Sequence, residues 1–300
     1  MIEREGTYKI IFSEYLSDPV VNPSLSRSTI KDLLFNSPAH AWFNNPRLNP
    51  DYKEKENGKF DIGTAAHAML LEGADSIVVI DAEDWRTKVA KEARDNAREE
   101  GKTPLLPHQF AEVSKMVTQA KCQILECKEL HIKDLSEDGD AELTYIWQEG
   151  DTWFRTRPDW ISKDKNLCID YKTAGGSINP NEIGRHIVSM AYDIQNSLYV
   201  RGIKAIEGIN PKFVFIFQST EEPYLCSFIA LSPQFIDMGN SKCDFGIWLW
   251  RKCLSSNKWP GYPSRVCWVD PPAWSLASWE IIGASIGEGE DSYEGKKINN

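Results

Sequence analysis

Two carboxylates and a lysine lie close together in the segment 155–173, which reads RTRPDWISKDKNLCIDYKT. Asp159 follows a proline, and Asp170 and Lys172 form an Asp-x-Lys pair after a short spacer. Because strand side chains alternate between two faces, Asp170 and Lys172 point the same way and Tyr171 points the other way. Carboxylates that converge at a sheet edge can hold Mg²⁺ or Mn²⁺, and a neighbouring lysine can handle the proton or the charge of an attacking water. This set of residues indicates hydrolysis of phosphodiester bonds.

Strand-like runs are expected to position these residues. From 141 onward the apolar pattern changes to a period of two, and tight turns at 149–151 and 163–166 separate the runs. The runs are 141–148, 152–162 and 167–173. Such short turns predict an antiparallel meander.

Helices and two further strands complete a predicted catalytic core over 141–254. The segments are an amphipathic helix over 180–204, buried strands over 212–219 and 224–231, and a helix over 233–254. This order predicts an α/β fold in which a central mixed sheet, containing the meander, is flanked by helices.

The preceding part, 24–135, is predicted to be mainly helical and to add to this core. Ser26 or Ser28 suits the cap of a first helix that ends before Pro38. The charged stretch 84–133 is predicted to be helical on both sides of an interruption that contains two prolines. Its basic residues alternate with acids, which favours a solvated face.

A small-residue helix is expected over 60–73, FDIGTAAHAMLLEG, with Gly73 just past its end. His67 lies in its middle, and a single histidine on such a stretch is more often a hydrogen-bonded core residue than a ligand. Glu72 lies about 140° around the helix from His67. The two residues therefore do not form one ligand face by spacing alone.

Composition places bounds on the class of protein. The 300 residues are 41% hydrophobic and 11% aromatic, enough for a substantial core, and no apolar run reaches the roughly 18–20 residues of a membrane span. Seven cysteines without a C-x-x-C pair, and an N-terminus without a signal-peptide layout, predict a cytoplasmic protein with reduced thiols. The net charge of −10 argues against a protein that merely coats nucleic acid, but it is compatible with an enzyme acting on DNA.

One domain over 1–286 is the expected organisation. The segment 255–286 is rich in Trp, Pro and Gly, and we expect it to wrap the domain as ordered loop because its aromatic side chains favour burial. The last residues, 287–300, are polar and predicted to be disordered.

Four motifs in order resemble the PD-(D/E)xK nuclease superfamily, and within it the branch of exonuclease VIII (the RecE C-terminal domain) and related phage exonucleases. The motifs are SLSRSTIKDLLFNSPAHAWF, GTAAHAMLLEG, the hairpin RTRPDWI with IDYKT, and DIQNSLYVRG, which is similar to the Gln-x-x-x-Tyr motif of RecB-type nucleases. A lone D…DxK occurs often by chance, whereas four motifs over roughly 24–268 are specific.

The resemblance implies a role for each motif residue. It makes His67, Asp159, Asp170 and the backbone carbonyl of Tyr171 ligands of Mg²⁺, for which Mn²⁺ can substitute. It makes Lys172 the catalytic lysine, which as a base would need a pKa lowered by burial and a nearby metal.

The helix motif adds Gln195 and Tyr199, which lie four apart on one helix face. The resemblance places them at the site or on the DNA strand, and core packing by Tyr199 is the alternative. No cysteine group has the spacing that holds an iron–sulfur cluster in some relatives, and no nucleotide-binding motif is present, so neither cofactor is expected.

Other polar residues of the hairpin are candidates with open alternatives. Glu142 could be a further acid near the metal or a solvated strand end. Arg155 and Arg157 share a face with Asp159 by alternation, so they could contact the scissile phosphate or neutralise the carboxylates. Thr173 is a further candidate for a phosphate contact.

The resemblance implies an Mg²⁺-dependent exodeoxyribonuclease of DNA recombination or repair. Such an enzyme hydrolyses linear double-stranded DNA from 5′ to 3′, leaves 5′-phosphates and encloses the strand in a ring-shaped homo-oligomer. A single-strand-annealing recombinase would be its partner, in the cytoplasm of a bacterial host of a phage. Two alternatives stay open: a structure-selective endonuclease on the same fold, and a non-catalytic DNA-binding or scaffold protein.

Overall fold

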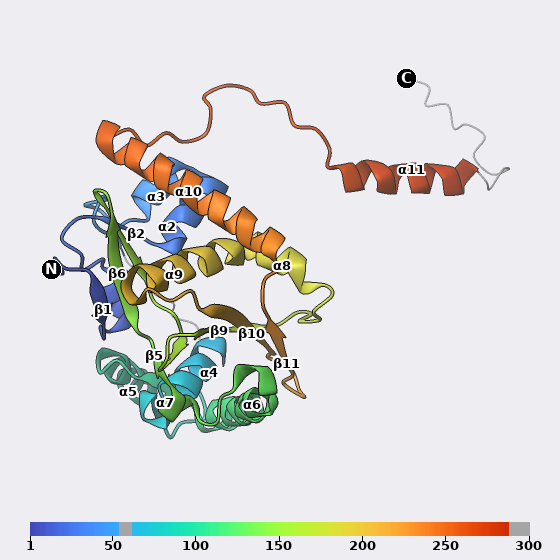
Figure 1. The fold of residues 1–300 in the computed structure, drawn as a ribbon. Helices are drawn as coiled ribbons and strands as arrows, with labels where there is room; N and C mark the ends of the chain where they lie inside the picture. Colours follow the sequence, from blue (N-terminus) through green and yellow to red (C-terminus); the bar gives the residue numbers. More distant parts are fainter. Residues whose placement is uncertain (54–61, 288–300) are drawn as a thin grey trace. The chain divides into compact units, whose positions relative to one another are not determined.

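The computed structural model describes residues 1–53 and 62–287. The chain divides into two compact units, Met1–Gly261 and Tyr262–Asn300. Within the first unit, helices cover both faces of the sheet that contains β9 and β10 (Figure 1). The fold is thus the predicted α/β class with a central mixed sheet flanked by helices.

Two sheets form the centre of the first unit. The five-stranded sheet, in the order β11-β10-β9-β8-β5, consists of β5 (Gly139–Ala141), β8 (Trp160–Ser162), β9 (Leu167–Ala174), β10 (Lys212–Ser219) and β11 (Cys226–Ile229). The four-stranded sheet, in the order β1-β6-β7-β2, consists of β1 (Gly6–Tyr8), β2 (Ser24–Leu25), β6 (Thr144–Glu149) and β7 (Thr152–Thr156). The parallel pairing of β9 with β10 makes the five-stranded sheet mixed, since its other pairs are antiparallel.

The predicted meander is divided between these two sheets. β6 and β7 pair antiparallel in one sheet, and β8 and β9 pair antiparallel in the other. The chain crosses from β7 to β8 at Arg157-Pro158-Asp159, where Pro158 has no N–H to donate to a ladder. The expectation of one continuous meander is therefore wrong at this step, although each hairpin is confirmed.

Helices of varied length and two short strands build most of the N-terminal part. They are α1 (Phe12–Leu16), α2 (Arg27–Lys31), the π-helical turn η1 (Asp32–Asn36), α3 (Pro38–Phe43), α4 (Ile62–Leu71), the 3₁₀ turn η2 (Ala74–Ser76), β3 (Ile77–Val79), α5 (Lys88–Glu99), β4 (Thr103–Leu105), α6 (Pro107–Glu126), the 3₁₀ turn η3 (Lys128–Leu130) and α7 (Leu135–Asp138). The side chain of Ser26 accepts a hydrogen bond from Thr29 N, so the predicted cap of α2 is confirmed. Ser37 caps α3 in the same way, with Pro38 in its first turn.

The helix expected over 180–204 is two helices, α8 (Ile183–Met190) and α9 (Tyr192–Glu207). Ala191 lies between them with φ 56°, in the left-handed region that ends an α-helix. α9 therefore starts in a new direction at Tyr192, which sequence periodicity could not reveal because apolar residues continue through the break.

Two apolar clusters lie on opposite faces of the five-stranded sheet. The first contains residues of α9 and of α10 (Pro233–Ser256), and the second contains residues of α4 and α6. The alternation of β9 follows this division, since Cys168 belongs to the first cluster and Ile169 and Tyr171 to the second.

Glycines allow α9 to pack closely on both sides. A Cβ added at Gly202 would come within 2.5 Å of the indole ring of Trp147 on β6. One added at Gly239 on α10 would clash with the backbone of Asp193 on α9. The position of α9 is thus set by the absence of side chains at these two points.

The second unit contains α11 (Ala273–Gly287), so the expectation of a loop over 255–286 is wrong for this helix. Of the expected wrapping segment, the part within the first unit packs Trp259 edge-on against Trp250, with ring centroids 5.5 Å apart. The predicted disordered tail lies, after Gly287, outside the described residues.

The seven cysteines are free thiols. Within the described ranges, no helix combines the length and apolar character that crossing a bilayer requires.

Candidate active site

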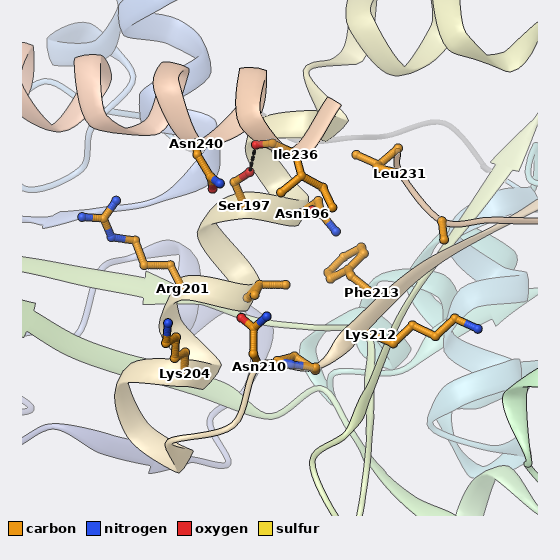
Figure 2. Close-up of a pocket in the computed structure, with 13 residues that line it drawn as sticks. Asn196, Ser197, Arg201, Lys204, Asn210, Lys212, Phe213, Leu231, Ile236 and Asn240 are labelled. Carbon is orange, nitrogen blue, oxygen red and sulfur yellow. Dashed lines mark hydrogen bonds between the residues drawn. The ribbon is translucent and has the colours of Figure 1, made fainter. Parts of the chain in front are cut away.

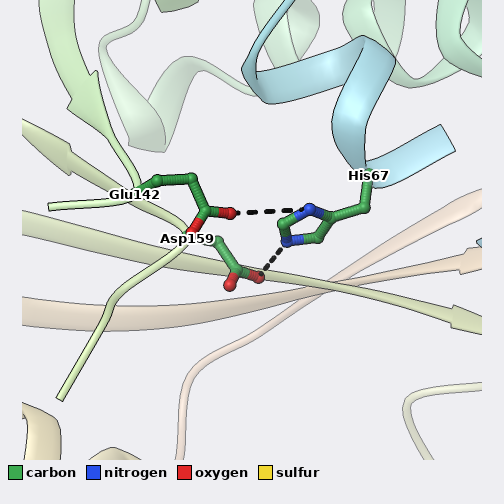
Figure 3. Close-up of side chains that lie close together, drawn as sticks. All are labelled: His67, Glu142 and Asp159. Atoms are coloured by element: carbon green, nitrogen blue, oxygen red, sulfur yellow. Dashed lines mark ion pairs between the residues drawn. The ribbon is translucent and has the colours of Figure 1, made fainter. Parts of the chain in front are cut away.

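His67, Glu142 and Asp159 come together where α4 meets the connections around β5 and β8 (Figure 3). His67 Nε2 lies 3.2 Å from Asp159 Oδ2, and His67 Nδ1 lies 3.6 Å from Glu142 Oε1. One ligand atom from each residue falls within 4.8 Å of the others. An imidazole nitrogen and two carboxylate oxygens are a donor set that divalent cations accept.

The backbone holds Glu142 in an unusual conformation. Its φ is 57°, which is uncommon for a residue other than glycine. Its N–H donates to the backbone carbonyl of Asp159 at 3.0 Å, which joins the β5–β6 connection to the start of β8. The bend directs the carboxylate toward His67 instead of along the strand. Glu142 is thus part of the site, and the alternative of a solvated strand end is wrong.

Asp159 links this group to β9. Its Oδ2 atom accepts a hydrogen bond from Tyr171 N at 2.7 Å, and the residue is 9% exposed. Tyr171 directly follows Asp170 in the Asp-x-Lys motif. The hydrogen bond to its N–H therefore brings the Asp159 carboxylate next to Asp170 in space.

Asp170 forms a second group with Lys172 and Gln195. Asp170 is fully buried, its Oδ1 atom pairs with Lys172 Nζ, and its Oδ2 atom accepts a hydrogen bond from Gln195 Nε2. The Lys172 ammonium also lies 5.6 Å from the ring centroid of Tyr192 at the start of α9. A buried carboxylate, a lysine and an amide donor thus converge beside the first group.

The charges of the two groups shift each other's titration. Burial would lower the pKa of His67, but the carboxylates of Asp159 and Glu142 outweigh it and raise that pKa to about 9. Burial and the Asp159 charge raise the pKa of Glu142 to about 7 and that of Asp170 to about 6. Positive charge is therefore strongly favoured among these carboxylates, which is what a bound metal ion supplies; ligation by His67 would require it to release its proton.

Asp159 and Lys172 shift in the directions that their partners dictate. Burial alone would raise the pKa of Asp159, but the charges of His67 and Lys172 and its hydrogen bonds lower it. Burial alone would lower the pKa of Lys172, but Asp170 and Asp159 raise it. Without a metal ion beside it, the lysine pKa is thus raised because the nearby carboxylates outweigh burial; the lowering expected with a metal ion stays a prediction.

The two predicted arginines are separated. Arg157 Nε lies 2.9 Å from Glu142 Oε2, and its guanidinium carbon lies 5.2 Å from the ring centroid of Phe12, so it remains beside the site. Arg155 Nη1 instead lies 3.1 Å from Asp18 Oδ2, with side-chain exposures of 6% and 0%. Arg155 is therefore not placed to contact a phosphate, and that expectation is wrong.

The Gln195–Tyr199 pair also divides. Gln195 contacts Asp170, whereas Tyr199 belongs to the first apolar cluster and meets Phe213 edge-on at 6.1 Å between centroids. Thr173 is half-buried on β9, directly opposite Gln218 of β10.

Arg27 is a neighbour that sequence reasoning missed. Its guanidinium carbon lies 5.5 Å from the centroid of Tyr192, the same ring that Lys172 approaches, and its Nη2 donates to the Met190 carbonyl. Its position inside the Ser-Arg-Ser start of α2 was the available signal, since the serines were considered only as caps.

One of the solved structures found by comparison, that of a candidate exonuclease, shares this fold. No curated protein sequence matches the chain. The crystal structure of a candidate exonuclease from Eubacterium rectale is 10% identical, covers 90% of this chain and 99% of its own, and superposes with a TM-score of 0.55. The structure of SSO0001 is also 10% identical, covering 86% of this chain and 100% of its own with a TM-score of 0.27.

A family model matches residues 26–268, a range that includes every residue of the two groups described above. Its description is a PDDEXK-like domain of unknown function (DUF3799). The chain belongs to this PDDEXK-like family.

Proposed function

We propose that this chain is a divalent-metal-dependent deoxyribonuclease. The observation that carries the proposal is the contact between two groups: His67, Glu142 and Asp159 on one side, and Asp170 with Lys172 on the other. A structural ion pair would need only matched charges. Here buried carboxylates gather around a histidine and a lysine, as phosphodiester hydrolysis requires.

His67, Glu142 and Asp159 would hold Mg²⁺ or Mn²⁺, and the family resemblance adds Asp170 and the Tyr171 carbonyl. When bound, such an ion supplies Lewis-acid chemistry, which neutralises charge on the phosphodiester and makes a water more acidic. Gln195 holds the orientation of Asp170 through its hydrogen bond. Lys172 presents ammonium donors next to Asp170 that can orient a water or a phosphoryl oxygen.

Arg157 would neutralise charge at the rim of the site. Its guanidinium already pairs with Glu142 and is only 11% exposed, so it would contact DNA only by sharing donors with that carboxylate. Thr173 remains a candidate for a phosphate contact from β9.

The finer proposal is an exonuclease that degrades linear double-stranded DNA from 5′ to 3′ and leaves 5′-phosphates. The motif resemblance to exonuclease VIII supports it, and the fold is shared with a candidate exonuclease. A ring-shaped homo-oligomer, a single-strand-annealing recombinase as partner, a role in DNA recombination or repair and a bacterial cytoplasmic location are parts of the same proposal.

The test is digestion of a linear duplex labelled at either 5′ end, beside a covalently closed circle, with Mg²⁺ or with EDTA. Lys172→Ala serves as the inactive control against contaminating nucleases, and Lys163→Ala, an exposed lysine of the same hairpin, as its matched partner. We expect Mg²⁺-dependent release of mononucleotides from 5′ ends, with the circle intact. No cleavage of either substrate with Mg²⁺ or Mn²⁺ would refute the nuclease.

Cleavage of the closed circle would identify the second candidate, a structure-selective endonuclease. An exonuclease needs a terminus, whereas the same carboxylates and lysine can cut an internal bond. The two candidates share the site and differ in how DNA enters it.

A further inference from the structure

A pocket of about 450 Å³ lies between α9, α10, the start of β10 and the end of β11 (Figure 2). Its volume is within the range of small-molecule sites, about 300–1,000 Å³. None of its lining residues belongs to the candidate active site. The two sites use different faces of α9, because Gln195 contacts Asp170 while the next residue, Asn196, lines the pocket.

Asn196 and Ser197 are the two buried polar residues of this pocket among those described, and Ser197 Oγ already donates to the Ile236 carbonyl. Asn196 is 4% exposed, and its side-chain amide has no hydrogen-bond partner within residues 1–53 and 62–287. In Figure 2 the amide points toward the ring of Phe213. The amide is not among the buried side-chain atoms left without a partner, so it opens on the pocket, where a ligand offering both a donor and an acceptor can pair with it.

The walls beside Asn196 are apolar. Phe213 and Leu231 are buried, and Val200 adds a half-buried side chain from α9. A flat aromatic ring packs well against such surfaces, and stacking on an aromatic side chain tolerates every nucleobase. The edge of a base carries the paired donors and acceptors that an asparagine amide recognises.

The mouth of the pocket carries positive charge. Lys204 is exposed and has no ion-pair partner in the described part of the chain. Lys212 lies 4.0 Å from Glu129 Oε2 in an exposed and therefore weak pair, and in Figure 2 its ammonium points away from Lys204. Arg201 is bound to Glu149 and Asp244 and does not count as a free cation.

We propose that this pocket binds a nucleoside monophosphate unit, with the base between Phe213 and Leu231, its edge on Asn196, and the phosphate on Lys204. The unit is a free nucleotide or the end of a DNA strand. Binding does not depend on the proposed catalysis, because the pocket shares no residue with the active site.

The test is ligand-observed NMR titration of the full chain in EDTA, with deoxyadenosine monophosphate as the probe. We expect saturable binding that Asn196→Leu weakens about tenfold and that Lys204→Gln weakens about two- to fivefold. Lys91→Gln, an exposed lysine on α5, and Lys172→Ala should leave it unchanged. If Asn196→Leu does not fold, Lys204→Gln, which changes an exposed residue, carries the comparison with Lys91→Gln.

A second arm uses a 5′-phosphorylated tetranucleotide to identify the source of the unit. Binding of the free nucleotide supports a soluble ligand, and binding of the tetranucleotide alone supports a strand end. Loss of binding in Lys172→Ala, with binding retained in Asn196→Leu, would overturn the proposal by assigning the ligand to the active site. Absence of binding for both probes would overturn it too, without bearing on cleavage.

Discussion

Two charged clusters lie at the two ends of the segment Arg155–Asp159, and they differ in how their charges are matched. Around Arg155, the Asp18 carboxylate accepts hydrogen bonds from Ser24 N at 2.8 Å and Ser24 Oγ at 2.7 Å. Arg155 itself donates to the Ser24 and Tyr15 carbonyls. Each charge in this cluster has a protein partner, as expected of a buried structural pair.

In the cluster around Asp159, by contrast, several buried carboxylates lie close to one another. Burial and repulsion by the Asp159 charge raise the pKa of Glu142 and Asp170. The fold therefore keeps these carboxylates close together although their negative charges repel. Such an arrangement is unfavourable for stability and is typical of functional sites. The comparison teaches that neither residue type nor pairing alone identifies a functional charge; here the difference is that several buried carboxylates lie close enough to raise one another's pKa.

The largest expected effect separates the clusters by activity. Lys172→Ala should reduce cleavage by about 10²–10⁴-fold, the contribution of a positioned proton-transfer group. Its stability should change less than that of a variant in the Arg155 cluster, because the pKa of Asp170 is already raised to about 6 and the carboxyl can take up a proton when the lysine is removed. Steady-state cleavage with urea unfolding measures both, and a normal rate would show that the lysine assignment is wrong.

The next effect is on stability. Arg155→Ala should lower the free energy of unfolding by about 3–5 kcal/mol, because it leaves the buried Asp18 carboxylate without its cation. The activity of each folded molecule should stay near that of the unsubstituted protein. Arg157→Ala is the matched control, which should affect cleavage more than unfolding. Equal losses of stability in both variants would contradict the assignment of a structural role to the Arg155 cluster and a functional role to the Asp159 cluster.

Metal affinity gives a third, smaller effect. Glu142→Gln keeps the shape of the side chain but removes its charge, and should weaken Mn²⁺ binding about tenfold or more, as changes around metal sites commonly do. Calorimetric titration measures this, with Glu137→Gln, an exposed acid on α7, as the control. Unchanged affinity would count heavily against Glu142 as a ligand.

The smallest effects should come from α9. Gln195→Ala removes a hydrogen bond to a charged carboxylate. It should raise the activation free energy of cleavage by about 1–2 kcal/mol, which lowers the rate five- to thirtyfold. Tyr199→Phe should change this activation free energy by less than about 0.5 kcal/mol, since the ring packs in the core. A larger loss of activity in Tyr199→Phe would show that the Tyr199 hydroxyl takes part in cleavage.

Local patterns predicted the part of the site that lies on regular structure. Asp170 and Lys172 share a face because β9 is a straight strand, and Gln195 reaches them because α9 covers that face. His67 was identified from the motif of its helix, since its spacing from Glu72 carried no information.

The errors lie where the chain departs from regular structure. Arg155 was placed beside Asp159 by an alternation that Pro158 interrupts. The position of Glu142 depends on a left-handed backbone angle, and the division of α8 from α9 depends on another at Ala191. Such angles are set by tertiary contacts, so neither composition nor periodicity indicates them.

The close packing of α9 at Gly202 and Gly239 has a consequence for genetics. A single added methyl group at either position would displace the helix that carries both Gln195 and Asn196. A loss-of-function screen should therefore recover substitutions at these glycines in proteins whose candidate site residues are all intact. Activity would then depend on two glycines that contact neither the metal nor the substrate in the proposed mechanism.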